Sequence, residues 1–276
     1  MFLRPSPQTD EIFLYVLAVA AERFGILVHA YCVLSNHFHC VVTDPDGVLP
    51  AFGQYLASLV ARASNALHGR WESFWAPGSY SAVRLETPED VLDKMAYTLA
   101  NPVSAGLVRR GVEWPGPWSS PDMIDGPPLV VSRPQHFFRA TGTLMPVSAK
   151  LRVVAPPGAM PVEEFRAKLL EQVQSLEAHA AGELDRNGGV FQGVDRVLAQ
   201  SPFARPPGQE PRRGLRPRVA CRDRWKRVEA LRRLKDFLRS YREAWSKFAS
   251  GVREVVFPHG TYWMRVAYGV PCAASG

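Results

Sequence analysis

Hydrophobic and polar positions alternate along the first hundred residues with two different periods. Over residues 9–24, 50–67 and 87–101, apolar side chains recur every three or four positions, which predicts three amphipathic helices. The first helix is expected to end at Gly25. The third is expected to end near Asn101-Pro102, because proline disfavours helical backbone in the residue before it.

The segments between these helices have the pattern of strands. Residues 26–34 and 37–43 are β-branched and aromatic runs separated by a short polar stretch, and residues 74–86 are a further strand-like run. Helices and strands that alternate in such short units indicate an α+β fold. We therefore expect an antiparallel sheet that carries its helices on one face.

The rest of the chain is organised differently. Residues 111–128 are rich in Pro, Gly and Trp, and they are expected to form a linker. Helical spacing returns beyond this segment, over residues 161–185, 194–199 and 223–249. The pattern predicts a first domain over residues 1–118 and a mainly helical, basic extension over residues 119–276.

The charge of the chain is unevenly distributed. The 276 residues carry a formal net charge of +7, and most of the excess lies after about residue 204. This favours a polyanionic partner, with nucleic acid first and an anionic membrane surface second. The sequence has no recognisable signal peptide and no apolar run of membrane-spanning length, and its four cysteines show no CxxC spacing. We therefore expect a cytoplasmic protein without a zinc ribbon or a disulfide framework.

Two histidines stand near the middle of the second strand-like run. His37 and His39 are two positions apart, so an extended backbone directs both side chains to the same face. Two imidazoles in this arrangement can bind one metal ion. The alternative is that both histidines are polar residues on a solvated strand face, and the spacing by itself does not decide between these interpretations.

A second candidate pair lies on the third predicted helix. Tyr97 and Asn101 are four residues apart and share one helix face. A tyrosine hydroxyl is a weak nucleophile at neutral pH, because its ordinary pKa is near ~10, and a neighbouring cation or base is needed to activate it. A divalent ion held by His37, His39 and the Asn101 amide oxygen would supply that charge. The alternatives are a half-buried helix aromatic for Tyr97 and an ordinary helix end for Asn101.

These two motifs together resemble a known family. The segment His37-Phe38-His39, preceded by Asn36, resembles the HUH motif, in which a hydrophobic residue separates two histidines. Residues 97–108 resemble the signature Y-x-x-x-N-P-V-x-A-G-L-V of the REP-associated tyrosine transposases, which are single-tyrosine enzymes of the IS200-like superfamily. The resemblance covers about residues 9–118, with the motifs in the same order.

The resemblance implies a fold and a reaction. The implied fold is an RRM-like or ferredoxin-like antiparallel sheet, and the implied reaction is metal-dependent cleavage and joining of single-stranded DNA through a 5′-phosphotyrosine intermediate. Tyr97 would be the nucleophile, and His37 and His39 would bind Mg²⁺ or Mn²⁺. Asn101 falls where relatives place a polar third ligand, often the longer Gln.

The implied partner is single-stranded or hairpin DNA at the nucleoid. Neither a membrane nor a small-molecule substrate is expected, and both a monomer and a homodimer remain open. The family has a strand before the first helix, whereas here only residues 1–7 precede it, with Phe2 and Leu3 as a remnant. Either the start of the sequence lies too late or the strand is truncated. Truncation would favour the alternative of a domesticated DNA-binding protein that has lost cleavage, whereas the intact Tyr97, His37 and His39 argue against that loss.

An unrelated metallohydrolase built on the two histidines is a third interpretation. It is disfavoured, because no set of Asp, Glu or His residues would complete a two-metal site with them. The remaining histidines have no ligand spacing and are expected to be surface or structural residues: His29, His68, His136, His179 and His259.

The basic excess is concentrated in one segment of the extension. Its cations are dense enough to neutralise a row of phosphates, and they are Arg212, Arg213, Arg216, Arg218, Arg222, Arg224, Lys226 and Arg227. Nearby aromatic residues are candidates for stacking on unpaired bases, namely Trp225, Tyr241, Trp245 and Trp263. The alternative is that Trp225 and Tyr241 belong to the apolar face of a helix whose arginines are simply solvated.

Overall fold

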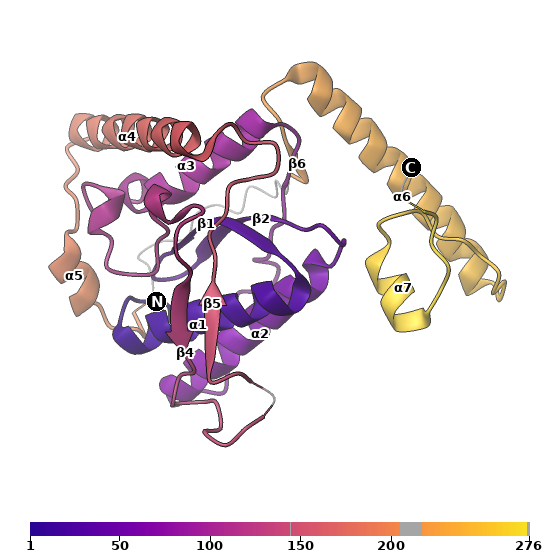
Figure 1. The fold of residues 1–276 in the computed structure, drawn as a ribbon, viewed down its shortest axis with the longest axis horizontal. Helices are drawn as coiled ribbons and strands as arrows, with labels where there is room; N and C mark the ends of the chain where they lie inside the picture. The colour runs from indigo at the N-terminus through magenta and orange to yellow at the C-terminus, as the bar shows by residue number, and fades with distance from the viewer. Residues whose placement is uncertain (144, 205–216, 275–276) are drawn as a thin grey trace.

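The computed structural model describes residues 1–143, 145–204 and 217–274, and it shows an α+β fold in which about half the residues are helical (Figure 1). The α-helices are α1 (Pro7–Phe24), α2 (Leu49–Leu67), α3 (Pro88–Ser104), α4 (Val162–Arg186), α5 (Val194–Ala199), α6 (Arg224–Ala249) and α7 (Tyr262–Tyr268). Short 3₁₀ turns lie at Gly111–Glu113 and Pro121–Met123.

The strands form small sheets of two strands each. Antiparallel pairs join β1 (Leu27–Val33) to β2 (Phe38–Thr43) and β4 (Leu129–Ser132) to β5 (Ser148–Leu151), whereas β3 (Arg84–Leu85) and β6 (Val219–Ala220) pair in parallel. Of the strand expected over residues 74–86, only the two residues of β3 are extended and paired. No clear ferredoxin-like sheet is present within the described residues.

The helix that carries Tyr97 begins at a strong local signal. Thr87 accepts a hydrogen bond from the Asp90 N–H, while the Asp90 carboxylate accepts one from the Thr87 N–H. This capping box and the proline at the first helical position define the start of α3. The helix ends close to the expected position near Asn101-Pro102, but it includes Pro102 and continues to Ser104.

The β1–β2 hairpin presents the two histidines. Val33 pairs with Phe38, and Cys32 pairs with His39, so the turn between the strands holds His37 one residue before β2 begins. The Leu34 N–H donates to the His37 carbonyl at 2.8 Å and closes this turn.

Segments from later in the chain cover the other edge of β1. The Val33 N–H donates to the Pro117 carbonyl, and the Val154 N–H donates to the Val28 carbonyl, both at 2.9 Å. The expected linker over residues 111–128 is in fact packed against the hairpin, with Trp114 and Ile124 buried. Trp114 is a core residue and Trp118 is half-buried against the same cluster, so a segment rich in Pro and Gly is packed against the fold here.

Helices lie on both faces of the hairpin, not on one face as expected. Phe38 packs against Phe13 of α1, with 5.1 Å between the ring centroids, whereas the next residue, His39, packs against Tyr97 of α3. Because neighbouring strand residues point to opposite faces, α1 and α3 must lie on opposite sides of β2.

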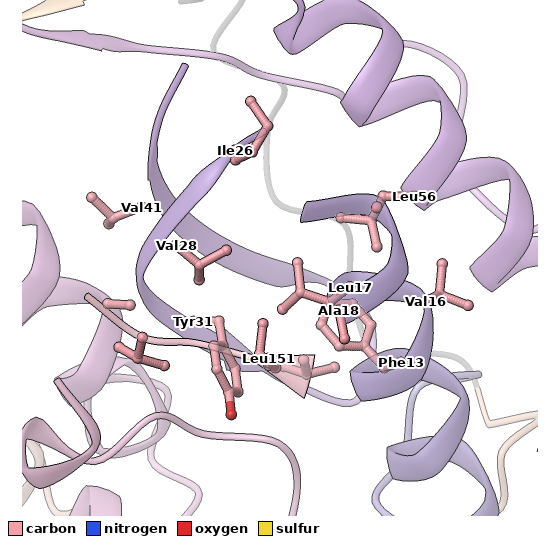
Figure 2. Packing of buried hydrophobic residues seen from close by; sticks show 14 of the residues in the cluster. Phe13, Val16, Leu17, Ala18, Ile26, Val28, Tyr31, Val41, Leu56 and Leu151 are labelled. Carbon is pink, nitrogen blue, oxygen red and sulfur yellow. The ribbon is translucent and has the colours of Figure 1, made fainter. Parts of the chain in front are cut away.

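The main core draws on both parts of the chain. Figure 2 shows Phe13, Leu17 and Tyr31 packed together with Leu56 and Leu151, and all five are at most 1% exposed. Further residues beyond position 118 belong to the same cluster, namely Ile124, Val131, Val153, Phe165, Leu169 and Val173. The extension therefore completes the core under the hairpin.

In residues 224–274, which we call the C-terminal arm, α6 extends away from this core and the segment at α7 turns back (Figure 1). Residues 259–262 and Arg265 of the arm line a small pocket together with residues 45–47. Only Ala230 and Ala244 of α6 are buried, and Trp225 is 77% exposed, so Trp225 is not the core residue that its helical register allowed. The second half of α6 packs with α7 around a separate small cluster that includes Phe257. Over the described ranges, no helix is both long and apolar enough to cross a bilayer.

Candidate active site at His37, His39 and Tyr97

The structure brings His37, His39 and Tyr97 together. The ring centroids of His37 and His39 are 5.0 Å apart, and those of His39 and Tyr97 are 5.6 Å apart. The three residues come from the hairpin turn, from β2 and from α3, which packs across both strands of the hairpin. Side chains almost sixty positions apart in the sequence thus share one site.

Asn36 orients His37 from the preceding position. The Asn36 side-chain oxygen lies 2.7 Å from Nδ1 of His37. An amide oxygen can only accept, so this contact requires a proton on Nδ1 of His37. A histidine whose other ring nitrogen is fixed in this way is the arrangement that metal sites use to orient a ligand.

The electrostatics around His39 keep its imidazole neutral. The pKa of His39 is lowered to about 4, mainly by burial and also by the neighbouring His37 and Lys94. Neutral imidazole is the form that binds metals, because protonation removes the lone pair that would be donated.

Lys94 is a member of this site that the sequence reasoning missed. Its ammonium nitrogen lies 4.7 Å from the ring centroid of Tyr97, which is 42% exposed. The signal was available, since Lys94 precedes Tyr97 by three positions and residues three apart are neighbours on a helix. Its charge lies where a phenolate or a phosphate would be stabilised.

Asn101 lies one helical turn beyond Tyr97 and is 7% exposed. The Trp118 indole N–H donates to the Leu99 carbonyl at 2.9 Å, which fixes this end of α3 against the segment after it. Among the residues that the structure describes, no three His, Cys, Asp or Glu side chains cluster to hold a metal. The donors that the structure brings together are the imidazoles of His37 and His39, and no described contact joins the Asn101 amide to them. Two imidazoles fit a divalent ion that keeps water or phosphate oxygens as its other ligands.

The cations of the basic segment do not form one continuous exposed row within the described residues. Arg212, Arg213 and Arg216 lie outside the described residues. Arg222 Nε lies 2.5 Å from the Asp93 carboxylate, so this cation is paired within the protein. The others are exposed around the start of α6, namely Arg218, Arg224, Lys226 and Arg227.

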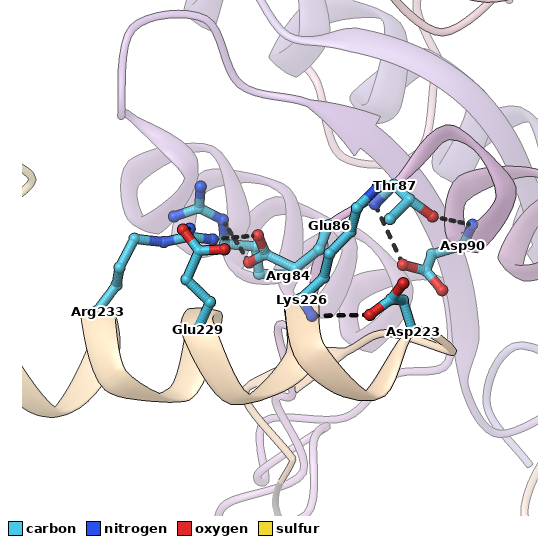
Figure 3. A network of polar contacts seen from close by, with 8 residues as sticks. All are labelled: Arg84, Glu86, Thr87, Asp90, Asp223, Lys226, Glu229 and Arg233. Carbon is cyan, nitrogen blue, oxygen red and sulfur yellow. Dashed lines mark hydrogen bonds and ion pairs between the residues drawn. The ribbon is translucent and has the colours of Figure 1, made fainter.

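Polar contacts join the start of α6 to the start of α3 (Figure 3). The side chain of Glu86 is 8% exposed and contacts both Arg84, at 3.1 Å, and Arg233, at 2.5 Å. The Asp90 carboxylate accepts a hydrogen bond from the Arg222 N–H at 2.8 Å. These contacts hold the arm to the helix that carries Tyr97.

A cavity of about 460 Å³ lies beside this junction. Its lining includes Lys94 on one side and Arg222 and Arg227 on the other, together with Asp90 and Asp93. Lys94 lines this cavity and also contacts the Tyr97 ring, so it links the two.

Two of the remaining histidines have clear structural roles. His29 is buried, its Nδ1 lies 2.8 Å from the Val154 carbonyl oxygen, and its Nε2 lies 2.8 Å from the Thr43 hydroxyl. Burial lowers the pKa of His29. His68 lies 3.3 Å from the Phe2 carbonyl oxygen.

Phe2 and Leu3, the expected remnant of a first strand, form no strand, and the Leu3 N–H donates to the Ser35 carbonyl.

Comparisons of this chain with protein-family models, curated proteins and solved structures find no match. The geometry of the site and the motifs in the sequence are therefore what indicate its function.

Proposed function

We propose that this protein is a metal-dependent, single-stranded DNA endonuclease and strand transferase, acting as a transposase of the kind that its motifs resemble. The observation that carries the proposal is the convergence of Tyr97 with His37 and His39 at one site. Each of these residues has an ordinary explanation by itself, but those explanations do not require the three to meet.

In the proposed reaction, Tyr97 Oη attacks a backbone phosphorus atom. The bond from phosphorus to the 3′ oxygen of the preceding nucleotide breaks, which leaves a 5′-phosphotyrosine and a strand that ends in a 3′-hydroxyl. The phenolic proton leaves to solvent, and the 3′ oxygen takes up a proton. Lys94 favours the phenolate and the charge that develops on the phosphate, because its ammonium lies beside the ring.

His37, His39 and Asn101 are the residues that would hold a divalent metal, Mg²⁺ or Mn²⁺. When bound, the ion would polarise the phosphodiester and stabilise the leaving oxygen. Asn36 would keep His37 in the required tautomer through the contact described above. Because the phosphotyrosine conserves the energy of the cleaved bond, a 3′-hydroxyl can attack it in return, so cleavage and joining are the same step run in two directions.

We also propose that the hairpin belongs to an RRM-like or ferredoxin-like sheet. The support is the antiparallel β1–β2 pair and the pairing of β1 with segments near Trp118 and Val153 on its other edge. A cytoplasmic, nucleoid-associated location would follow from this function.

A DNA-binding protein of the same fold without cleavage is the second candidate. One observation favours it: within the described part of the chain, β2 has a strand partner only on the β1 side. The sheet that presents the histidines is therefore open on one edge, which would position the ligands less rigidly.

Covalent adduct formation separates the two candidates. The protein is incubated with a labelled single-stranded hairpin DNA and Mn²⁺, and the products are resolved on a denaturing gel. The transferase proposal expects a protein–DNA adduct that is absent with a chelator and in Tyr97→Phe, and present in the control Tyr80→Phe, which changes a tyrosine that is 59% exposed. If the wild type binds the hairpin but forms no adduct, the second candidate is correct.

A further inference from the structure

The C-terminal arm has a packed interior of its own. Phe257 is fully buried, and the buried residues around it are Ala244, Val255, Met264 and Val270. The Phe257 N–H donates to the Pro271 carbonyl, and the Ala273 N–H donates to the Phe257 carbonyl, so the end of the chain is tied to this cluster. Side chains on the surface of the arm are consequently held in defined positions.

A run of aromatic rings crosses the outside of this unit. Trp245 stacks on Phe248, with centroids 6.2 Å apart and planes at 30°, and Phe248 meets Tyr268 edge to face at 5.8 Å. Trp245 is 43% exposed and Tyr268 is 62% exposed. Each outer ring is thus supported by Phe248 while much of its surface remains available to a ligand.

Cations outnumber carboxylates in the segment that carries these rings, with Arg242, Lys247 and Arg253 against Glu243 and Glu254. The guanidinium of Arg253 lies 4.8 Å from the ring centroid of Phe248. The 26-residue helix α6 contains nine Lys or Arg and three Asp or Glu residues. Among the ion pairs of the described residues, none involves Arg242, Lys247 or Arg253. The aromatic run therefore lies in a region whose cations have not been neutralised within the protein.

We propose that the arm binds an unpaired DNA strand, with bases stacked on Trp245 and Tyr268 and phosphates near Arg253 and Lys247. Exposed aromatic rings together with unpaired cations are the combination that sequence-independent single-strand binding requires. The choice of DNA over RNA rests on the proposed function, whereas the choice of an unpaired strand rests on the rings alone. This surface is separate from the site of cleavage and from the basic segment before α6.

An exposed apolar surface could also bind a second copy of the same chain, but the positive charge of α6 disfavours this. Pairing two such arms would bring two cationic helices together, and like charges at an interface oppose association. A polyanion gains from the same charge, because binding it releases counterions. Fully paired DNA would gain only the phosphate contacts, since its bases are already stacked.

The test measures binding of a short fluorescent oligo(dT) to the full chain by anisotropy. The double variant Trp245→Ala/Tyr268→Ala is expected to bind roughly 10-fold or more weakly, because each stacked base loses its aromatic partner. The control Val256→Ala/Val266→Ala removes apolar surface of the same arm, at positions 59% and 56% exposed, and should bind as the wild type does. Circular dichroism verifies that both variants remain folded.

The proposal is overturned if the double variant binds oligo(dT) as tightly as the wild type. Loss of self-association in sedimentation velocity, with unchanged oligo(dT) binding, would show that a second copy of the chain occupies this surface. The proposal is also overturned if binding of a duplex of the same length weakens equally. The proposed cleavage is tested separately, because Tyr97→Phe should leave oligo(dT) binding intact. An arm that binds single strands in a protein that forms no adduct would support this inference and refute the transferase.

Discussion

Replacing Lys94 by Met tests whether the cation beside Tyr97 serves the proposed reaction. The substitution removes one positive charge while a flexible side chain of similar length still covers the helix surface. Lys94 lies 4.7 Å from the Tyr97 ring and also lowers the pKa of His39, so its charge acts on both halves of the candidate site. We expect the substitution to affect metal binding and strand cleavage in opposite directions.

The magnitude follows from Coulomb's law. Two unit charges about 5 Å apart interact by roughly 1.7 kcal/mol at an effective dielectric of about 40, and partial exposure reduces this to about 1 kcal/mol. Loss of this attraction at the developing phenolate and phosphate charge should slow adduct formation about 5-fold. Loss of the repulsion between Lys94 and a bound dication should strengthen metal binding by a similar factor or more.

The assay is single-turnover adduct formation on a labelled hairpin at saturating Mn²⁺, with the Mn²⁺ affinity measured separately by electron paramagnetic resonance. Lys150→Met, on an exposed strand position of β5, is the control and should leave both quantities unchanged. The pKa of His39, followed by NMR, should rise in Lys94→Met towards its ordinary value. Metal affinity and cleavage rate that fall together, or that both stay constant, would show that Lys94 is structural and that the electrostatic reasoning is wrong.

Three other predictions follow from the same structure. Burial raises the pKa of Asp10 to about 7, so between pH 4 and pH 7 the native state holds a proton that the unfolded state releases. The free energy of unfolding should therefore fall by up to about 4 kcal/mol over this pH range. In urea unfolding, Asp10→Asn should abolish this fall, while the control Glu22→Gln should not. Leu151→Ala should lower the free energy of unfolding by about 2–5 kcal/mol, because Leu151 is 1% exposed in the main core. Val130→Ala, at a position of the same β4–β5 hairpin that is 59% exposed, should change the free energy of unfolding little. Equal effects would show that the extension does not complete the core. Adduct formation should stop with a chelator and recover more with Mn²⁺ than with Mg²⁺, since imidazole nitrogens suit the harder Mg²⁺ poorly, and equal recovery would argue against histidine ligands.

Local patterns in the sequence were sufficient for most of the helices. The start of α3 was predictable from contacts within four residues. Thr87 and Asp90 form hydrogen bonds with the free backbone N–H groups of the first turn, and Pro88 has the backbone conformation that a helix start requires. The end of α1 at Gly25 was predictable for a similar reason, since its φ of 63° is a conformation that glycine adopts readily. The α5 bounds, Val194–Ala199, also match the expectation from spacing.

Predictions failed where a distant part of the chain supplies the deciding contact. Residues 111–128 have the composition of a linker, but Trp114 and Ile124 are buried against β1 and the core. Trp225 has the helical register of a core residue, but the described segments leave it exposed. Burial depends on which segments meet, and neither composition nor periodicity contains that information.

The same distinction applies to the candidate site. The sequence by itself determined that His37 and His39 share a face of one strand and that Tyr97 and Asn101 share a face of one helix, because these relations depend only on backbone geometry. Only the tertiary structure decided that the His39 and Tyr97 rings lie 5.6 Å apart and that Lys94 lies between the nucleophile and a cavity. It also decided that α1 and α3 occupy opposite faces of the hairpin, because that choice depends on the packing of Phe38 and His39 against different helices.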